Sequence, residues 1–162
     1  MNRKEYNVIV MSWSDGLYRF ALNFLKNQEE AKDIVQDVFE KLWLNKDKVE
    51  TEKAKSWLFT CAHNAMINFV HKRARTTFMD SNLLPERTEI VRFQYESAQV
   101  IDHIVGILPP LQKSIILLRD LEGYSYDEIG DILNLSPSQV KVYLFRARMK
   151  IKKQLKGLNE TA

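Results

Sequence analysis

Apolar residues recur at intervals of three and four along nearly the whole chain, and no convincing run alternates between apolar and polar residues. Intervals of three and four place side chains on one stripe of an α-helix, whereas a half-buried strand needs alternation. The sequence therefore predicts an all-α protein. Its 162 residues, 45% of them hydrophobic, suffice for one ordinary domain or two small ones with a buried core.

Breaks in this periodicity divide the chain into two helical parts. Helices are expected at about 5–26, 29–44, 54–77, 93–108 and 111–121, followed by two more near the C-terminus. From Phe78 to Arg92 the periodicity fades around Pro85, which indicates a linker. We therefore expect two small helical domains, 1–78 and 95–162, joined by a flexible linker at 79–94.

Two of the N-terminal helices have a clear apolar stripe. In the helix at 29–44, the residues expected to face the core are Ile34, Val35, Val38, Phe39, Leu42 and Trp43. In the helix at 54–77, they are Trp57, Leu58, Cys61, Ala62, Ala65, Met66, Phe69 and Val70. The other side of this helix offers Thr60, His63, Asn64, Asn68, His71, Lys72 and Arg75. We expect the apolar stripes to be buried and these polar sides to be exposed.

The C-terminal part contains two capping boxes, in which a serine stands three residues before Glu or Gln. Ser125 precedes Glu128, and Ser136 precedes Gln139. Such pairs satisfy the free N–H groups at the start of a helix. They predict a short helix, a tight turn and a longer final helix, and this arrangement is a helix-turn-helix.

The final helix carries only positive charge on its polar face. Between positions 138 and 156 there is no Asp or Glu, and the basic residues are Lys141, Arg146, Arg148, Lys150, Lys152, Lys153 and Lys156. A helix-turn-helix inserts the first turns of its second helix into the major groove of duplex DNA. The residues expected to contact DNA are Ser138, Gln139, Lys141, Val142, Phe145, Arg146 and Arg148. An ordinary solvated helix would also explain the charge, but not the coincidence with two capping boxes and a tight turn.

Composition indicates the cellular compartment in which the protein is expected. Cys61 is the single cysteine, so no disulfide within the chain is possible and a reducing compartment is expected. No segment approaches the roughly 20 apolar residues that cross a bilayer. These features predict a soluble, cytoplasmic protein.

An enzyme is one alternative, with a carboxylate-bridged metal site on Glu29, Asp33 and Asp37. Such a site usually needs Glu-x-x-His pairs on other helices, and the sequence has none. Nothing supplies a nucleophile with its base, and glycine loops that cradle phosphates are missing. We therefore expect no catalytic residue, metal or cofactor.

Two stretches together resemble the bacterial sigma factors of the extracytoplasmic-function (ECF) class. The C-terminal one, LPPLQKSIILLRDLEGYSYDEIGDILNLSPSQVKVYLFRARMKIKKQL, is similar to the domain that recognises the −35 promoter element. The N-terminal one is EEAKDIVQDVFEKLWLN followed by AKSWLFTCAHNAMINFVHKRAR, which is similar to the domain that binds core RNA polymerase and opens the −10 element. The resemblance implies a promoter-specific transcription initiation factor.

The resemblance also implies roles for particular residues. Core polymerase would meet the helix at 29–44 through Asp33, Gln36, Asp37, Glu40 and Trp43, with Leu42 beside them. The separated −10 strand would meet Asn64, Asn68, His71, Lys72 and Arg75, together with Arg73. The loop 45–55 matches the segment that captures an unstacked −10 base, whereas the helical phase of Trp57 places that residue in the core. Val142 and Tyr143 depart from the residues frequent in the family, which leaves the base preference at −35 undefined.

The partners implied are core RNA polymerase, promoter DNA and an anti-sigma factor, commonly membrane-anchored, that clamps between the two domains. A conventional helix-turn-helix regulator remains the alternative, with the N-terminal half as a dimerisation or ligand-sensing module. Such a regulator would account equally well for the C-terminal part, but not for the N-terminal resemblance.

Overall fold

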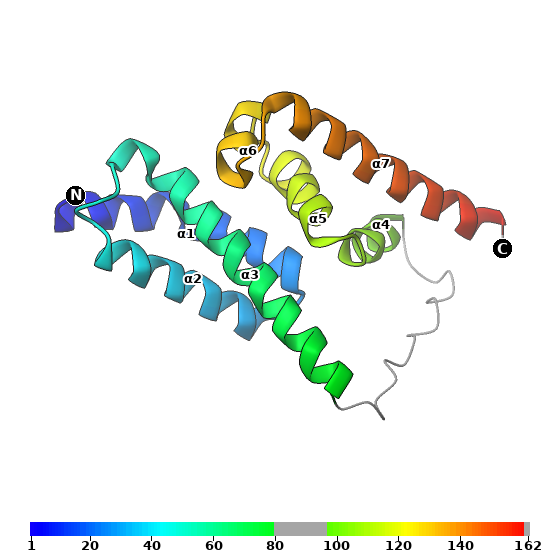
Figure 1. Cartoon of the computed structure of the whole chain (residues 1–162), viewed down its shortest axis with the longest axis horizontal. Helices are drawn as coiled ribbons and strands as arrows, with labels where there is room; N and C mark the ends of the chain where they lie inside the picture. Colours follow the sequence, from blue (N-terminus) through cyan, green and yellow to red (C-terminus); the bar gives the residue numbers. More distant parts are fainter. Residues whose placement is uncertain (80–96, 161–162) are drawn as a thin grey trace.

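Three long helices make up the N-terminal unit in the computed structural model of the chain, which describes residues 1–79 and 97–160. They are α1 (Arg3–Leu25), α2 (Gln28–Leu44) and α3 (Ala54–Met79), with a short 3-10 helix, η1 (Thr51–Lys53), before α3. Asn2 caps α1 by accepting from Glu5 N at 2.8 Å, and Asn27 caps α2 by accepting from Glu30 N at 2.9 Å. The three helices pack together as Figure 1 shows.

The C-terminal unit consists of shorter helices followed by one long helix. They are α4 (Ser97–Gly106), α5 (Pro110–Ile116), η2 (Leu117–Leu121), α6 (Tyr126–Leu133) and α7 (Pro137–Glu160). The described residues of both units form no strand, and the all-α prediction with two helical units is confirmed. All but the first residue of the linker expected at 79–94 lie outside the described ranges, as do the first residues of the helix expected at 93–108.

The helix expected at 111–121 changes its hydrogen bonding halfway. Its second part, η2, is a π-helix, in which Glu122 N donates to Leu117 O at 3.0 Å. The prediction of a single α-helix is therefore wrong over this segment. Over a single turn, i+4 and i+5 bonding leave nearly the same apolar pattern, so spacing does not separate them.

A core of aromatic and aliphatic side chains continues from one unit into the other. The fully buried side chains include Phe20, Phe24, Leu42, Phe59 and Met66 in the N-terminal unit. They also include Ile115, Leu118, Ile129 and Ile132 in the C-terminal unit. The two units touch where α3 lies against α6 and where α1 lies against η2 and α4.

This contact between units changes the buried face of α3. Phe59, which was not expected in the core, is fully buried, and His63, expected on the polar face, is only 7% exposed. Trp57 and Cys61, expected in the core, are only half-buried. Phe59 packs against both Phe20 of α1 and Tyr124 of the C-terminal unit, and His63 meets Ser114 of α5. The expected phase is therefore wrong because the buried side of α3 is the one that faces α1 and the C-terminal unit together.

Candidate nucleic-acid interface

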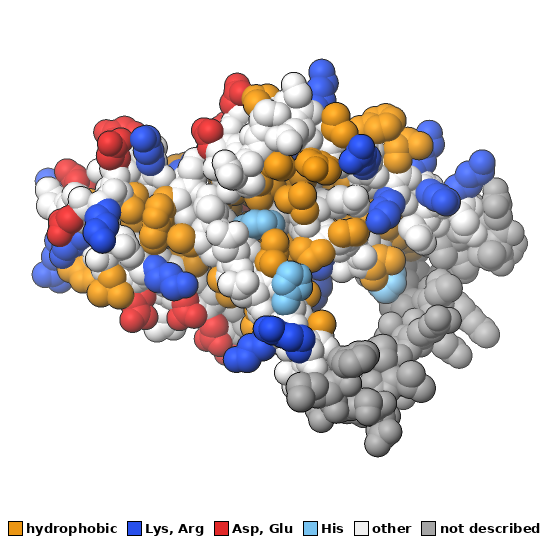
Figure 2. Space-filling view, viewed as in Figure 1, with side chains coloured by type: hydrophobic (Ala, Val, Ile, Leu, Met, Phe, Trp, Pro, Cys, Tyr) orange, Lys and Arg blue, Asp and Glu red, His pale blue; other side chains and the backbone are white. Residues whose placement is uncertain are grey.

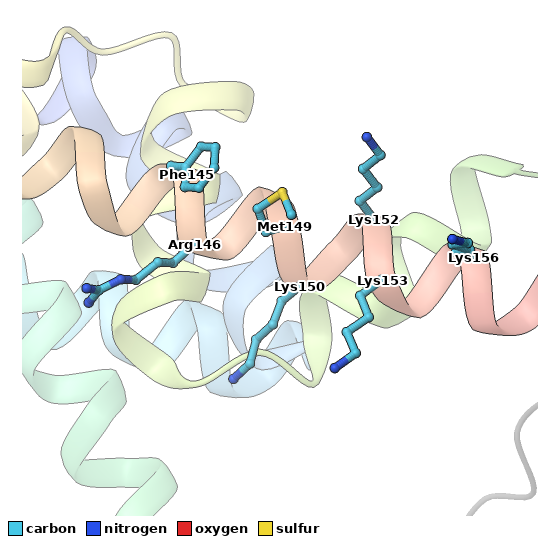
Figure 3. A pocket seen from close by; sticks show the side chains of 7 residues that line it. All are labelled: Phe145, Arg146, Met149, Lys150, Lys152, Lys153 and Lys156. Atoms are coloured by element: carbon cyan, nitrogen blue, oxygen red, sulfur yellow. The ribbon is translucent and has the colours of Figure 1, made fainter.

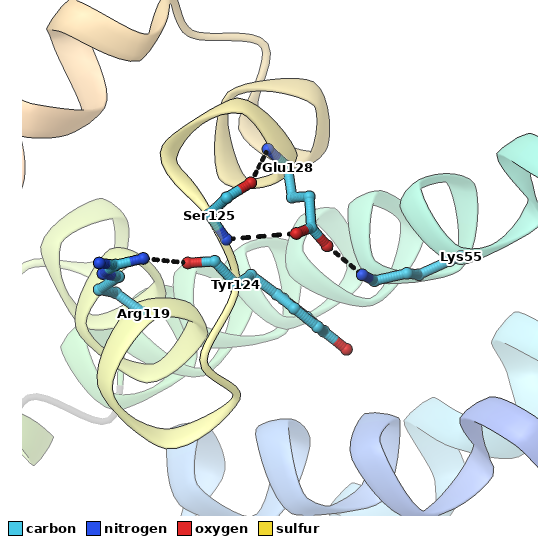
Figure 4. A network of polar contacts seen from close by, with 5 residues as sticks. All are labelled: Lys55, Arg119, Tyr124, Ser125 and Glu128. Carbon is cyan, nitrogen blue, oxygen red and sulfur yellow. Dashed lines mark hydrogen bonds and ion pairs between the residues drawn. The ribbon is translucent and has the colours of Figure 1, made fainter.

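The turn between α6 and α7 has the geometry of a helix-turn-helix. Ser125 Oγ accepts from Glu128 N at 3.1 Å, and Ser125 N donates to Glu128 Oε1 at 3.4 Å (Figure 4). At the other end of α6, Asn134 adopts a left-handed conformation with φ of 57°, and Leu135 N donates to Gly130 O at 2.9 Å. The first predicted capping box and the tight turn are confirmed.

The second capping box starts α7. Gln139 N donates to Ser136 Oγ at 3.1 Å, and Ser136 N donates to Gln139 Oε1 at 2.9 Å. The prediction of this box is also confirmed. Because its side-chain oxygen is engaged in the cap, Gln139 has its amide NH₂ group to offer to DNA.

The inward stripe of α7 fixes which residues face outward. Val140, Leu144 and Ala147 are buried, whereas Ile151 and Leu155 are half-buried. All seven residues predicted to contact DNA are exposed: Ser138, Gln139, Lys141, Val142, Phe145, Arg146 and Arg148. Val142 is 47% exposed and Phe145 65%, so two apolar side chains stand in the turns that a major groove would receive.

Basic side chains surround an apolar depression further along α7. Its lining residues are Phe145, Arg146, Met149, Lys150, Lys152, Lys153 and Lys156. Figure 3 shows these cations spreading from the helix on both sides of Phe145 and Met149. Figure 2 shows Lys and Arg side chains along α7, whereas Asp and Glu side chains gather over α2. The long stems of Lys can pack on such apolar surface while their charged ends reach phosphate oxygens.

Arg148 differs from the other basic residues of α7. Its Nη2 atom lies 2.7 Å from Asp120 Oδ1, which belongs to η2. This ion pair holds Arg148 against its own unit and offsets part of its charge. Only one of its guanidinium nitrogens is engaged and the side chain is 52% exposed, so its other N–H groups stay available to a phosphate.

The exposed side of α3 gathers the residues predicted to meet the separated strand. Asn68, His71, Lys72 and Arg75 line a shallow pocket together with Ala74, and Asn64 is exposed one turn earlier. Arg73 is different, because its Nη1 atom lies 3.7 Å from Glu30 Oε1 of α2. Arg73 is therefore oriented toward α2, away from the face on which it was expected.

An acidic face runs along α2. Asp33, Gln36, Asp37 and Glu40 are all exposed on it. Trp43 lies at its end, 37% exposed, with its ring edge-on to Tyr6 at 5.0 Å and Lys46 Nζ 3.6 Å from the ring centroid. Leu42 is fully buried, so it supports this surface from below and does not take part in it. The apolar spacing predicts a core position for Trp43, and that prediction is wrong. Trp43 is the second-last residue of α2, where the packing of the three helices ends, and it forms the edge of the acidic face.

His63 and Ser114 form a buried polar contact between the units. His63 Nδ1 lies 2.6 Å from Ser114 Oγ, and both side chains are buried. Burial lowers the pKa of His63 to about 4, so its imidazole is neutral at pH 7. Sequence reasoning missed this pair because Ser114 lies 51 positions from His63 in the chain, on another helix.

Acidification is expected to weaken the packing of the C-terminal unit on α3. The packed state holds His63 neutral with a pKa of about 4, whereas an exposed His63 would titrate near 6.5, so the separated units bind the proton more readily. The stabilisation is complete above pH 7 and is lost as the pH falls from 6.5 toward 4. At pH 5 the packing equilibrium should shift by up to about 30-fold. Small-angle scattering at pH 7.5 and 5 measures this shift, and His63→Asn should remove most of it.

Two further observations concern the described part of the chain. Within it, no group of three or more His, Cys, Asp or Glu side chains could hold a metal ion. No helix in the same ranges is long and apolar enough to cross a membrane.

The fold and its surfaces define a class of protein, a helix-turn-helix DNA-binding protein with a second helical unit attached. Comparison with known families narrows this class. The family model for sigma-70 region 2 matches residues 9–76, and the model for sigma-70 region 4 matches residues 98–151. The first match contains the acidic face of α2 and the exposed side of α3, and the second contains the helix-turn-helix.

Individual relatives agree with these matches. The chain is 30% identical over 139 residues to the RNA polymerase sigma factor SigV of Bacillus subtilis, an alignment that covers 85% of this chain and 83% of the relative. It is 28% identical over 148 residues to the ECF RNA polymerase sigma factor SigM of the same organism, covering 89% and 91%. The solved structure of the sigma factor RpoE from Bartonella quintana, in complex with the anti-sigma factor NepR, superimposes with a TM-score of 0.75 at 26% identity, covering 94% and 98%. The chain belongs to the sigma-70 family, in the extracytoplasmic-function class of RNA polymerase sigma factors.

Proposed function

We propose that this ECF sigma factor binds core RNA polymerase through α2, reads the −35 element with α7 and holds the opened −10 element with α3. The observation that carries the proposal is that one short chain combines both sigma-70 regions, each with its own exposed and chemically distinct surface. A conventional regulator has no need of the N-terminal surfaces. We place the domain boundaries at 1–78 and 95–162.

At the −35 element, the first turns of α7 enter the major groove. Arg146 has the fork geometry that recognises guanine, and Lys141 can contact a base edge or a flanking phosphate. Val142 and Phe145 offer apolar contact to thymine methyl groups. Ser138, Gln139 and Arg148 complete the set. Lys150, Lys152 and Lys153 lie further along the helix and contact phosphate oxygens.

At the −10 element, the exposed side of α3 holds a single strand. Lys72 and Arg75 neutralise its backbone, while Asn64, Asn68 and His71 provide hydrogen bonds to unstacked bases. The loop 45–55 receives one extruded base. This division leaves duplex recognition to α7 and strand capture to α3.

The acidic face of α2 is the docking surface for the polymerase. Asp33, Asp37 and Glu40 would complement a basic partner helix and raise the rate of encounter, and Trp43 adds a half-exposed aromatic anchor at the end of the same face. Gln36 lies between the carboxylates. The polymerase performs all nucleotide chemistry, so the chain is not an enzyme and works in the cytoplasm with its partner.

Membership of the ECF class of sigma factors also points to a regulatory partner. The Bartonella quintana sigma factor with a similar fold was solved in complex with an anti-sigma factor. We propose that an anti-sigma factor also holds this protein inactive, and that the anti-sigma factor itself carries the membrane anchor. Deleting the gene for that inhibitor should raise transcription from the target promoters.

Reconstitution with core polymerase tests the function directly. Transcripts induced by overexpressing the chain reveal shared upstream elements, and these supply the promoter for run-off transcription in vitro. Core enzyme alone should be silent at this promoter and should initiate once the chain is added. A chain that binds the promoter as a dimer but never associates with core polymerase would identify a conventional regulator instead.

Lys153→Ala is expected to weaken promoter binding equally at all sequences. Removing one phosphate contact should lower the slope of log affinity against log salt by about 1 and leave base preference unchanged. Titration of the holoenzyme onto promoter DNA at several salt concentrations measures the slope. Lys32→Ala is the matched control, because Lys32 is a similarly exposed lysine on α2, and it should leave the slope unaltered.

A further inference from the structure

Three apolar side chains form an exposed stripe along the outer side of α7. Val142, Phe145 and Met149 are spaced by three and four residues, which places them on one line of the helix. They are 47%, 65% and 49% exposed, whereas the opposite side of α7 packs on α4, α5 and α6. Exposed apolar side chains that gather in one place, unlike those that occur singly, mark a surface for binding.

Reading of DNA accounts for only the first part of this stripe. A recognition helix contacts base edges with its N-terminal residues, and Val142 and Phe145 lie in those turns. Met149 lies about 18 Å from Pro137, where the helix begins. Phosphate oxygens, which flank the helix beyond the base-reading turns, accept hydrogen bonds, and a thioether has none to donate. The contacts proposed for the −35 element therefore leave Met149 without a role.

Cations flank the stripe on both sides. By helical phase, Arg146, Lys150 and Lys153 fall on one side of Met149 and Lys152 falls on the other, as Figure 3 shows. None of these four cations has an ion-pair partner among the side chains that the structure describes. An apolar stripe between unneutralised cations is complementary to a helix that carries its own apolar stripe between carboxylates.

We propose that the outer face of α7 is a docking seat for an acidic amphipathic helix of a partner protein, and that this partner excludes the −35 duplex. The α7 seat consists of Phe145, Met149 and the four cations beside them. The proposal rests on the function assigned above, because it takes α7 as the reader of the −35 element. Phe145 and Arg146 belong both to the seat and to the predicted DNA contacts, so the two ligands compete.

The apolar stripe distinguishes such a partner from a simple polyanion. Val142, Phe145 and Met149 stand at positions i, i+3 and i+7, the spacing by which one helix packs along another. Carboxylates of the partner would speed the encounter and fix its orientation, while apolar side chains on Phe145 and Met149 would supply much of the affinity. The flexible, unbranched side chain of methionine adapts to the shape of what it contacts. A polyanion would use the cations alone and leave the stripe in water.

A labelled synthetic peptide tests the seat. It forms a helix of about 20 residues, roughly 30 Å long, with leucines repeated at i, i+3 and i+7 and glutamates beside them. Fluorescence anisotropy with the full chain, in the absence of polymerase and DNA, should show saturable binding. A peptide with the same glutamates and serines in place of the leucines should bind about tenfold more weakly or less. Absence of binding, or equal binding of the two peptides, would overturn the proposal.

Met149→Gln tests the contact from the side of the chain. Glutamine keeps the length and helix propensity of methionine but replaces its apolar end with an amide. Affinity for the peptide should fall by about fivefold or more, whereas affinity for a −35 duplex should change by less than about twofold. Met11→Gln is the matched control, because Met11 is 82% exposed on α1, and it should alter neither affinity. Equal effects of the two variants on peptide binding would place the peptide elsewhere and contradict the seat.

Competition experiments separate the seat from the proposed function. Unlabelled peptide should displace a −35 duplex from the chain, and the duplex should displace the peptide. Simultaneous binding of both would overturn the claim of exclusion. Core polymerase should bind the chain equally well with and without the peptide, because the acidic face of α2 lies in the other unit. Failure of the chain to bind any promoter duplex would count against the proposed function, whereas the seat is judged by the peptide alone.

Discussion

Replacing Gly130 by alanine should unfold or misorient the helix-turn-helix. A Cβ atom at this position would stand 2.4 Å from the carbonyl oxygen of Leu135, closer than such atoms can approach. Because the obstacle is backbone, the turn itself must shift, and we expect a loss of about 2–4 kcal/mol in the free energy of unfolding. Denaturant titration followed by circular dichroism measures the loss. Binding to a −35 duplex should fall with it, since this turn orients α7.

Gly157→Ala is the control for this change. Gly157 also lies within a helix, but among the described residues a Cβ atom there has no contact within 4 Å. Alanine should therefore stabilise α7 by about 0.5–1 kcal/mol through its better helix propensity. If the Gly130 variant were as stable as the Gly157 variant, the close approach of α6 to the residues before α7 would be incorrect.

Arg146→Ala and Asp37→Ala should separate the two activities of the protein. Loss of a bidentate base contact costs about 1–3 kcal/mol, so Arg146→Ala should weaken promoter binding by about 5- to 150-fold and leave core binding intact. Asp37→Ala should do the reverse, chiefly by slowing association with core polymerase. Fluorescence titration with core enzyme and holoenzyme binding to promoter DNA measure the two properties.

The matched controls lie on the same helices. Lys152→Ala removes charge from α7 beyond its first turns and should alter affinity without altering base preference. Lys32→Ala changes charge on α2 outside its acidic face and should leave core binding almost unchanged. Equal loss of both activities in the Arg146 or the Asp37 variant would argue against the division of labour between α7 and α2.

Local chemistry made the helix-turn-helix predictable. Both capping boxes depend on residues three apart, so Ser125 and Ser136 identify the two helix starts without knowledge of the rest of the fold. The exposed faces of α2 and α7 follow similarly from the spacing of their own apolar stripes. Their proposed roles rest on the family likeness and remain to be tested by the variants above.

Contacts between residues far apart in the chain could not be predicted from the sequence. By helical spacing, His63 and Thr60 belong to the polar side of α3. In the structure His63 is buried beside Ser114 of α5, and Thr60 is half-buried against Ile132 of α6. The orientation of Arg73 toward α2 and the pairing of Arg148 with Asp120 depend on partners that helical periodicity does not specify. The π-helical bonding of η2 leaves almost no trace in the apolar pattern.

Arg19 of α1 and Glu122, which follows η2, form an ion pair between the two units with Nε–Oε2 at 2.6 Å, and this pairing has a consequence for how much protein a cell needs. If a closed form, in which the two units stay packed together, dominates, the apparent dissociation constant for the promoter equals the intrinsic constant divided by the open fraction. A chain that is open about 1% of the time would thus appear about 100-fold weaker than its DNA contacts allow. A partner that binds the open form better raises that fraction in proportion to its own preference. The combined strength of the contacts between the two units, this ion pair among them, would then set the concentration at which transcription begins.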